Sequence, residues 1–165
     1  MNASFALRTV LVHHDGSPRA DYLVKSARDV AGSGARVVVL AVTCVPASLP
    51  LRGLPPEVDQ RAHNSLRWAR EVALRHGFQI ETKYRRARDL ARAIIIEAQM
   101  VDADAIFMTV DPPRFAWLRP RLSGTARDVL RYTPCPVIIG YFPKAAALDA
   151  SAAVAEVERI VMHSS

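Results

Sequence analysis

The sequence predicts an α/β protein built on a single doubly wound sheet of five parallel strands, in the order 3-2-1-4-5, with helices on both faces and a C-terminal helical tail. Strand and helix signals alternate along most of the 165 residues, which favours parallel strands joined by right-handed crossovers. The first two strand segments are runs of apolar, often β-branched residues, as in strands that are covered on both faces. The length suits one domain, which we place at residues 1–142, with a linker and a helix over residues 143–165.

The first strand covers residues 9–12, and the start of a helix follows it. Ser17 is a good N-cap residue, and Pro18 suits the first position of a helix. Apolar residues then recur at helical spacing until Gly32, where this helix is expected to end. The β-branched run at residues 37–42 predicts the second strand.

The remaining elements continue the alternation. A proline-rich connector over residues 48–56 leads into a longer helix that ends near Gly77. After it the sequence predicts, in order, a strand at residues 78–84, a helix at 90–100, a strand at 105–109, a helix at 125–132 and a last strand at 137–141.

The tail differs from the rest of the chain. Residues 143–147 are typical of a linker, and Val154, Val157, Ile160 and Val161 form a narrow apolar stripe on a predicted helix. Two interpretations stay open: the helix packs on its own domain, or it docks on a partner subunit or leads toward another domain.

Composition and cysteine use indicate a soluble, cytoplasmic protein. Hydrophobic residues make up 50% and charged residues 23% of the chain, which excludes a disordered class. Cys44 and Cys135 have neither a disulfide-framework nor a metal-knuckle spacing, so a reducing compartment is expected. The longest uncharged stretch, residues 37–51, is interrupted by prolines and is too short for a membrane helix. We therefore expect no membrane insertion.

Net positive charge alone does not predict nucleic-acid binding. The formal charge is +6, and arginines supply most of it, because Lys25, Lys83 and Lys144 are the only lysines. The arginines are spread along the chain, and the one tight cluster is at residues 85–88. Without interleaved aromatic residues or a recognisable reading helix, we expect no nucleic-acid partner.

The strand order places a candidate ligand crevice. Its topological switch point lies between strands one and four, whose carboxyl ends are residues 15–17 and 109–111. Asp15 has two open interpretations: its carboxylate accepts amide hydrogen bonds in the turn before the first helix, or it contacts a ligand. His13 and His14 do not predict a metal site, because neighbours on a strand point to opposite faces and no third ligand stands at a suitable spacing.

No catalytic constellation is visible in the sequence. The Gly-x-Ser-x-Gly pattern of a nucleophile elbow is absent, and no nucleophile stands with a recognisable base. Cys135 lies between two prolines, which is typical of a small buried residue rather than a reactive thiol. A phosphoreceiver domain has the same fold but needs an aspartate after strand three, where this chain has residues 83–85, Lys-Tyr-Arg. We therefore expect that the protein is not an enzyme.

Three segments resemble the universal stress protein family. Residues 9–17 are similar to its first strand and turn, and residues 103–108 to its Ala-Asp-Leu-Ile-Val-Met strand. Residues 130–139 resemble its closing sequence of a helix, an Ala-Pro-Cys-Pro turn and a last strand. These matches occur in the right order over residues 8–142, and the fold that the resemblance implies agrees with the one predicted from alternation.

One branch of that family binds ATP or a related adenine nucleotide through a loop after strand four. In this loop two residues separate the first glycine from the second, and nine residues separate the second glycine from a final Gly-Ser/Thr pair. Gly124 and Thr125 match the final pair, but Asp111 and Arg114 stand where the first two glycines belong. The resemblance therefore implies a non-enzymatic regulatory domain that acts through dimerisation and partner contacts, with ATP binding weakened or lost. The alternative is an adenine-nucleotide sensor in which arginines replace the glycines. Those arginines are Arg114, Arg119 and Arg121.

The resemblance also implies site and partner residues. The candidate nucleotide crevice comprises Asp15, Val42, Arg114, Gly124 and Thr125, with ATP or AMP as the candidate ligand. A homodimer is expected along the last strand, through Val137, Ile138 and Ile139, because this apolar edge would be exposed in a monomer. The sequence further resembles stress-protein domains appended to amino-acid permeases, so a fused transporter is another candidate partner.

Overall fold

The computed structural model describes residues 7–52, 55–110 and 122–141. Helices and strands alternate through this part of the chain, as predicted. They are β1 (Thr9–His13), α1 (Pro18–Ala31), β2 (Arg36–Cys44), α2 (Pro56–Arg75), β3 (Glu81–Ala87), α3 (Leu90–Met100), β4 (Ala105–Thr109), α4 (Gly124–Tyr132) and β5 (Val137–Gly140). The linker and helix predicted at residues 143–165 lie outside the described residues.

The five strands form one parallel sheet in the order β3-β2-β1-β4-β5, which confirms the predicted topology. β1 is the central strand, and its Leu11 is aligned with Val38 of β2 on one side and with Ile106 of β4 on the other. The turn that follows β1 therefore lies at the middle of the carboxyl edge of the sheet.

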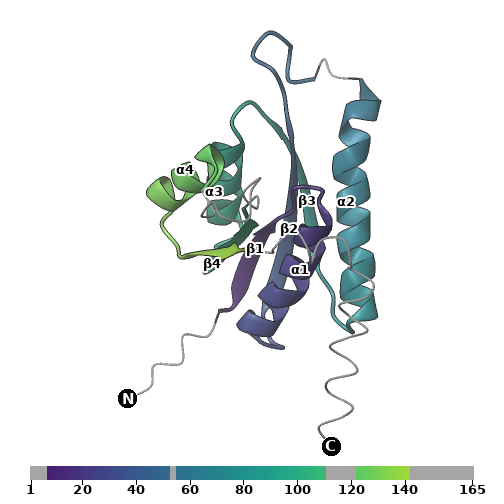
Figure 1. Cartoon of the computed structure of the whole chain (residues 1–165), viewed down its shortest axis with the longest axis vertical. Coiled ribbons are helices and arrows are strands. Elements are labelled where there is room, and N and C mark those ends of the chain that lie inside the picture. Colours follow the sequence, from purple (N-terminus) through teal and green to yellow (C-terminus); the bar gives the residue numbers. More distant parts are fainter. Residues whose placement is uncertain (1–6, 53–54, 111–121, 142–165) are drawn as a thin grey trace, which may run out of the picture.

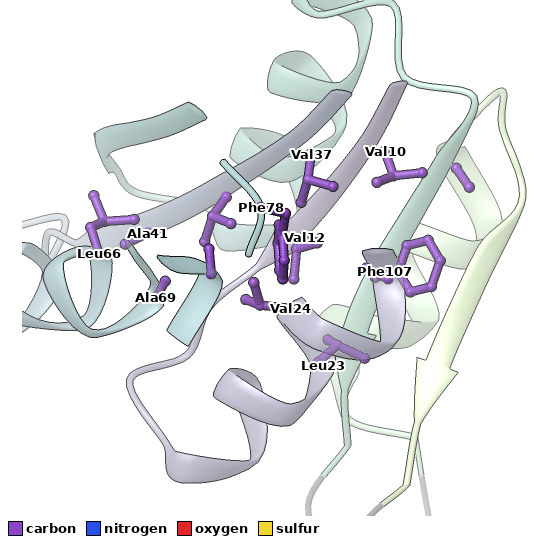
Figure 2. Close-up of a cluster of buried hydrophobic side chains, with 14 residues drawn as sticks. Val10, Val12, Leu23, Val24, Val37, Ala41, Leu66, Ala69, Phe78 and Phe107 are labelled. Atoms are coloured by element: carbon purple, nitrogen blue, oxygen red, sulfur yellow. The ribbon is translucent and has the colours of Figure 1, made fainter. Parts of the chain in front are cut away.

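Helices cover both faces of the sheet, with α1 and α2 on one side and α3 and α4 on the other (Figure 1). Alternate residues of β1 point to opposite faces, so that Val10 and Val12 pack toward α1 and α2 while Leu11 packs toward α3 and α4. Figure 2 shows the first of these clusters, in which Leu23 of α1 and Leu66 of α2 join the strand side chains. Burial on both faces explains why the sequences of β1, β2 and β4 are largely apolar.

The helix starts differ in how they are capped. The side chains of Asp89 and Ser123 accept hydrogen bonds from backbone amides in the first turns of α3 and α4. Ser17 occupies the N-cap position of α1, as predicted, but its side chain makes no capping bond. Instead its carbonyl oxygen accepts the amide of Ala20, 3.0 Å away, and its own amide donates to Asp15.

Both predicted boundaries of one strand are wrong by three residues, since β3 covers Glu81–Ala87 rather than residues 78–84. β3 begins at Glu81 rather than at Phe78, because the end of α2 extends into this segment: Gly77 adopts a positive φ of 73° and the amide of Phe78 donates to the carbonyl of Ala73. Phe78 is buried in the core as part of this turn. The shift places Arg85 and Arg86 inside the strand. The other predicted boundaries agree within two residues.

No helix in the described part of the chain combines the length and apolar character that crossing a membrane requires.

Candidate functional site

A cavity of about 290 Å³ opens at the carboxyl ends of β1 and β2. Its walls come from the end of β1 and the turn after it, from the last part of β2, from one stripe of α2 and from the first residue of α3. The lining residues are His13, His14, Asp15, Gly16, Ala41, Val42, Thr43, Val58, Arg61, Ala62, Ser65 and Leu90. The position is the carboxyl edge of a parallel sheet, where ligands of such folds bind.

Asp15 is held at the rim of this cavity by two hydrogen bonds. Its Oδ1 accepts the amide of Ser17 at 2.8 Å, and its Oδ2 accepts the hydroxyl of Thr109 at 2.9 Å. Partial burial favours the neutral acid, but the polar groups of Ser17 and the Thr109 hydroxyl outweigh it and hold the pKa of Asp15 below its usual value. The carboxylate is therefore ionised at neutral pH, with about half of its roughly four lone-pair positions still open.

The bond between Thr109 and Asp15 joins β4 to β1 across the predicted switch point. The sequence left two interpretations of Asp15 open. The hydrogen bond from the Ser17 amide shows one of them directly, namely that the carboxylate accepts an amide in the turn before α1. The cavity itself lies on the β2 side of the bond between Thr109 and Asp15, since β2 and α2 supply much of its wall whereas no residue of β4 lines it.

The two histidines that end β1 are both buried. Gly16 donates its amide to Nδ1 of His14 at 3.1 Å, so the proton of this ring lies on Nε2, which is 3.0 Å from Asp21 of α1. Burial lowers the pKa of His13 to about 4, and the neighbouring Asp15 offsets this only in part. His13 is therefore uncharged at neutral pH. Within the described residues, no three His, Cys, Asp or Glu side chains come together to hold a metal ion.

Arg61 reaches the cavity from α2 and lies against Gly16. The φ of Gly16 is +82°, a conformation that favours glycine, and a Cβ atom there would stand 3.3 Å from Nε of Arg61. The Arg61 side chain is exposed, and in the part of the chain that the structure describes it has no ion pair or hydrogen bond. No sequence motif distinguishes Arg61 as a site residue.

The arginines at residues 85–88 contact the helices and the connector that surround the cavity. Arg86 forms an ion pair with Asp59 of α2, and Arg85 with Glu97 of α3, at 2.6 Å between Nε and Oε2. Arg88 donates to the carbonyl oxygens of Pro46 and Leu49, at 2.9 and 3.0 Å, in the connector between β2 and α2. The cluster therefore holds helices and a loop around the cavity, so its positive charge has partners within the domain.

The structure brings together some of the predicted site residues. Asp15 and Val42 line the cavity, whereas Gly124 and Thr125 are the first residues of α4 and do not line it. Arg114 lies outside the described residues, as do Asp111, Arg119 and Arg121.

The α2 wall is the part that sequence reasoning missed. Val58, Arg61, Ala62 and Ser65 recur at the i, i+3, i+4, i+7 spacing of one helix face. That spacing was a usable signal, but it does not by itself tell which face of the helix meets a cavity.

Comparison with known proteins identifies the family of this arrangement. The model of the Universal stress protein family matches residues 6–139. No curated protein sequence matches the chain.

Solved structures share the fold at low sequence identity. A universal stress protein from Archaeoglobus fulgidus has a TM-score of 0.62 and 23% identity, with 80% of this chain and 92% of that chain covered. A universal stress protein in complex with cAMP has a TM-score of 0.60 and 21% identity, with coverage of 82% and 98%. The Archaeoglobus fulgidus protein in complex with dAMP has a TM-score of 0.58 and 22% identity, again with coverage of 82% and 98%.

Proposed function

Because the chain belongs to the universal stress protein family, we propose that it is a non-enzymatic regulatory domain that binds an adenine nucleotide through its nucleoside part, with weakened binding of ATP, and that acts through dimerisation and partner contacts. The observation that carries this proposal is the position of Asp15, an ionised carboxylate with open acceptor positions at the rim of a cavity of about 290 Å³.

The size and lining of the cavity suit a single nucleoside. Small-molecule sites usually measure roughly 300–1,000 Å³, and this cavity, at about 290 Å³, is just below that range. Val42 and Ala41 supply apolar surface, and Asp15 supplies an acceptor for ribose hydroxyl or base amino groups. Two of the similar structures are complexes with cAMP and with dAMP, which supports an adenine nucleotide as the ligand class.

Weakened ATP binding follows from the loop sequence after β4. Asp111 adds a negative charge where the family pattern has a glycine, and Arg114 replaces the second glycine. Gly124 and Thr125 do begin α4, where first-turn amides have no partner within the helix and suit an anion. One part of a phosphate site is thus retained, and the remainder of the pattern is lost.

The described chemistry favours binding over catalysis. The pKa of the Cys44 thiol is raised by burial and by nearby Asp89, which disfavours the reactive thiolate. The hydroxyl of Ser65 donates to the carbonyl of Ala62, and His14 is engaged by Gly16 and Asp21. In the described ranges, no serine or cysteine is hydrogen-bonded to a histidine that would activate it.

β5 supports dimerisation because it is a short, apolar, half-exposed edge strand. The carbonyls of Pro136 and Gly140 accept the amides of Ile106 in β4 and of Val110 directly after it. By the alternation of a parallel ladder, the main-chain groups of Val137 and Ile139 face the free edge. A second copy of this chain is the proposed occupant of that edge.

Thermal unfolding with nucleotides tests the nucleotide part of the proposal. A ligand that binds the folded state alone stabilises it by RT ln(1 + [L]/Kd), about 2.7 kcal/mol at a hundredfold excess over Kd. We expect millimolar adenosine and AMP to raise the melting temperature, and Asp15→Asn to remove the adenosine shift. Asp29→Asn, on the exposed surface of α1, is the matched control and should leave the shift unchanged.

The phosphate part needs a comparison of AMP with ATP. If the loop binds the outer phosphates weakly, ATP should stabilise the protein no more than AMP does. Asp111→Gly combined with Arg114→Gly should then make ATP the better ligand. An ATP shift several degrees above the AMP shift in the unmodified protein, lost in the double variant, would instead establish the arginine-based sensor.

A further inference from the structure

We propose that Arg61 is the phosphate-binding residue of the cavity and that the cavity therefore takes a nucleoside monophosphate in preference to the free nucleoside. This inference rests on the proposed function and deepens it, because it assigns the phosphate to a side chain of α2 rather than to the loop after β4.

The first argument is the availability of the guanidinium. Other arginines at this end of the sheet are engaged: Arg86 by Asp59, and Arg88 by two carbonyls of the connector. Arg61 has no such partner within the described residues, although it lies in the cavity wall. A guanidinium is a planar fork of donors that matches phosphate oxygens in a bidentate way, so an unengaged one in a cavity is suited to an anionic ligand.

The second argument is the placement of the side chain. Nε of Arg61 lies close enough to Gly16 that a Cβ there would be 3.3 Å away, and Cγ follows at 3.9 Å. The stem of the arginine thus rests on the turn after β1, and the missing side chain at Gly16 provides the room. Resting on this backbone limits the conformations of the side chain, which reduces the entropy lost when a ligand binds.

The third argument is the distribution of charge along the cavity. His13 is uncharged at neutral pH because burial lowers its pKa to about 4, so it adds no positive charge. Asp15 is ionised, accepts hydrogen bonds and repels a phosphate. Arg61 is the one arginine or lysine among the lining residues in the described part of the chain. The cavity therefore has an acceptor group for the hydroxyl or amino groups of the ligand and a donor group for its phosphate.

The experiment compares adenosine, AMP and ribose 5-phosphate on the full chain, by calorimetric titration and thermal unfolding. We expect AMP to bind at least tenfold more tightly than adenosine. Arg61→Ala should remove this difference and leave adenosine affinity unchanged, and Arg61→Lys should keep part of it, because a lysine keeps the charge but not the fork. Arg67→Ala changes an exposed arginine on the same helix that contacts Asn64 rather than the cavity, and should leave both affinities unchanged.

Each other outcome has a distinct meaning. Equal affinities for AMP and adenosine in the unmodified protein, or a difference that survives in Arg61→Ala, would overturn the assignment of Arg61 while leaving the nucleoside proposal standing. A parallel loss of adenosine and AMP binding in Arg61→Ala would show that the arginine holds the base, which also overturns it. If adenosine does not bind, the proposed nucleoside site fails, and ribose 5-phosphate then tests the phosphate-binding role of Arg61 separately. Binding of ribose 5-phosphate that Arg61→Ala abolishes would support that role. Absence of ribose 5-phosphate binding to the unmodified protein would refute it.

Discussion

β3 and β5 form the two edges of one sheet, yet their chemistry is opposite. β3 is seven residues long and carries Glu81, Lys83, Arg85 and Arg86. Glu81, Arg85 and Arg86 form ion pairs with β2, α3 and α2, and Lys83 pairs with Glu81 within the strand. β5 is four residues long, apolar and half-exposed along its whole length. Both strands have one row of unpaired main-chain groups, which is a template for pairing with another chain.

The difference indicates two ways of managing a sheet edge. On β3 the long charged side chains disfavour pairing with another strand, and Arg85 and Arg86 also contact α3, α2 and the connector after β2. On β5 nothing in the described residues opposes pairing, so a second copy of the chain is the proposed solution. The charged edge therefore supports the cavity, and the apolar edge is the proposed surface for assembly.

The largest effect is expected from breaking the ion pair between β3 and α3. The Glu97 side chain is 1% exposed, whereas that of its partner Arg85 is 44% exposed. Arg85→Ala leaves a buried carboxylate without a partner, and should lower the free energy of unfolding by about 3–5 kcal/mol. Urea denaturation measures this change.

A double variant serves as the control. Arg85→Met with Glu97→Leu replaces the pair with apolar side chains of similar size and should recover most of the lost stability. A loss below about 1 kcal/mol in Arg85→Ala, the value typical of exposed pairs, would mean that the charges of β3 do not anchor the helices.

The pH dependence of the unfolding free energy distinguishes His13, in the central strand, from the carboxylates that pair with the charges of β3. The folded-state pKa of His13 is about 4, against 6.5 as its ordinary value. The unfolded chain therefore takes up the proton first as pH falls, and His13 should remove about 3 kcal/mol of unfolding free energy between pH 7 and pH 4.

His13→Gln should flatten this part of the pH dependence, measured by urea denaturation at each pH. His76→Gln changes an exposed histidine after α2 and is the control. Asp59 and Glu81 act at lower pH: their pKa values are depressed, by hydrogen bonds from Arg86 for Asp59 and from Lys83 for Glu81, so the stability they contribute is lost only as pH falls below about 4. If the unfolding free energy of His13→Gln fell with pH between 7 and 5 as steeply as that of the unmodified protein, His13 in the central strand would not be the source of this pH dependence.

Transferring charge to the apolar edge tests the assembly surface. The unmodified protein should scatter light as twice 18.2 kDa at micromolar concentration, and Ile139→Lys should weaken the dimer about a hundredfold, or about 2.7 kcal/mol. Leu74→Lys, at an exposed position of α2, should not. Circular dichroism checks that Ile139→Lys is folded, and a monomeric mass for the unmodified protein would refute the β5 dimer.

The smallest effect is expected at the exposed pair of β3. Lys83 and Glu81 are each about one-third exposed at a separation of 2.9 Å, so Lys83→Ala should cost about 0.5 kcal/mol of unfolding free energy. High salt should abolish the difference, because screening is strong at the surface. A cost equal to that of Arg85→Ala would remove the distinction between buried and exposed pairs on this strand.

Local sequence patterns were sufficient to predict the sheet order, the alternation of elements and the position of Asp15. The continuous apolar runs of β1 and β2, Pro18 at the start of α1 and the glycines after the helices are local signals whose meaning does not depend on distant contacts. The boundary of β3 was predicted less well because Phe78 is apolar in either a turn or a strand, and its hydrogen bond to Ala73 decides between them.

The sequence by itself therefore determined the fold and one wall of the candidate site, whereas the tertiary structure decided the rest. Asp15 could be placed from the strand order, and the family resemblance implied Val42; both line the cavity. Arg61 could not be placed, because it reaches the cavity only through the packing of α2 across the sheet, and an exposed arginine on a helix looks the same wherever it points. The same holds for Arg85, Arg86 and Arg88, whose partners are 12–42 positions away: charge is a local property of the sequence, but its compensation depends on contacts that exist only once the chain has folded.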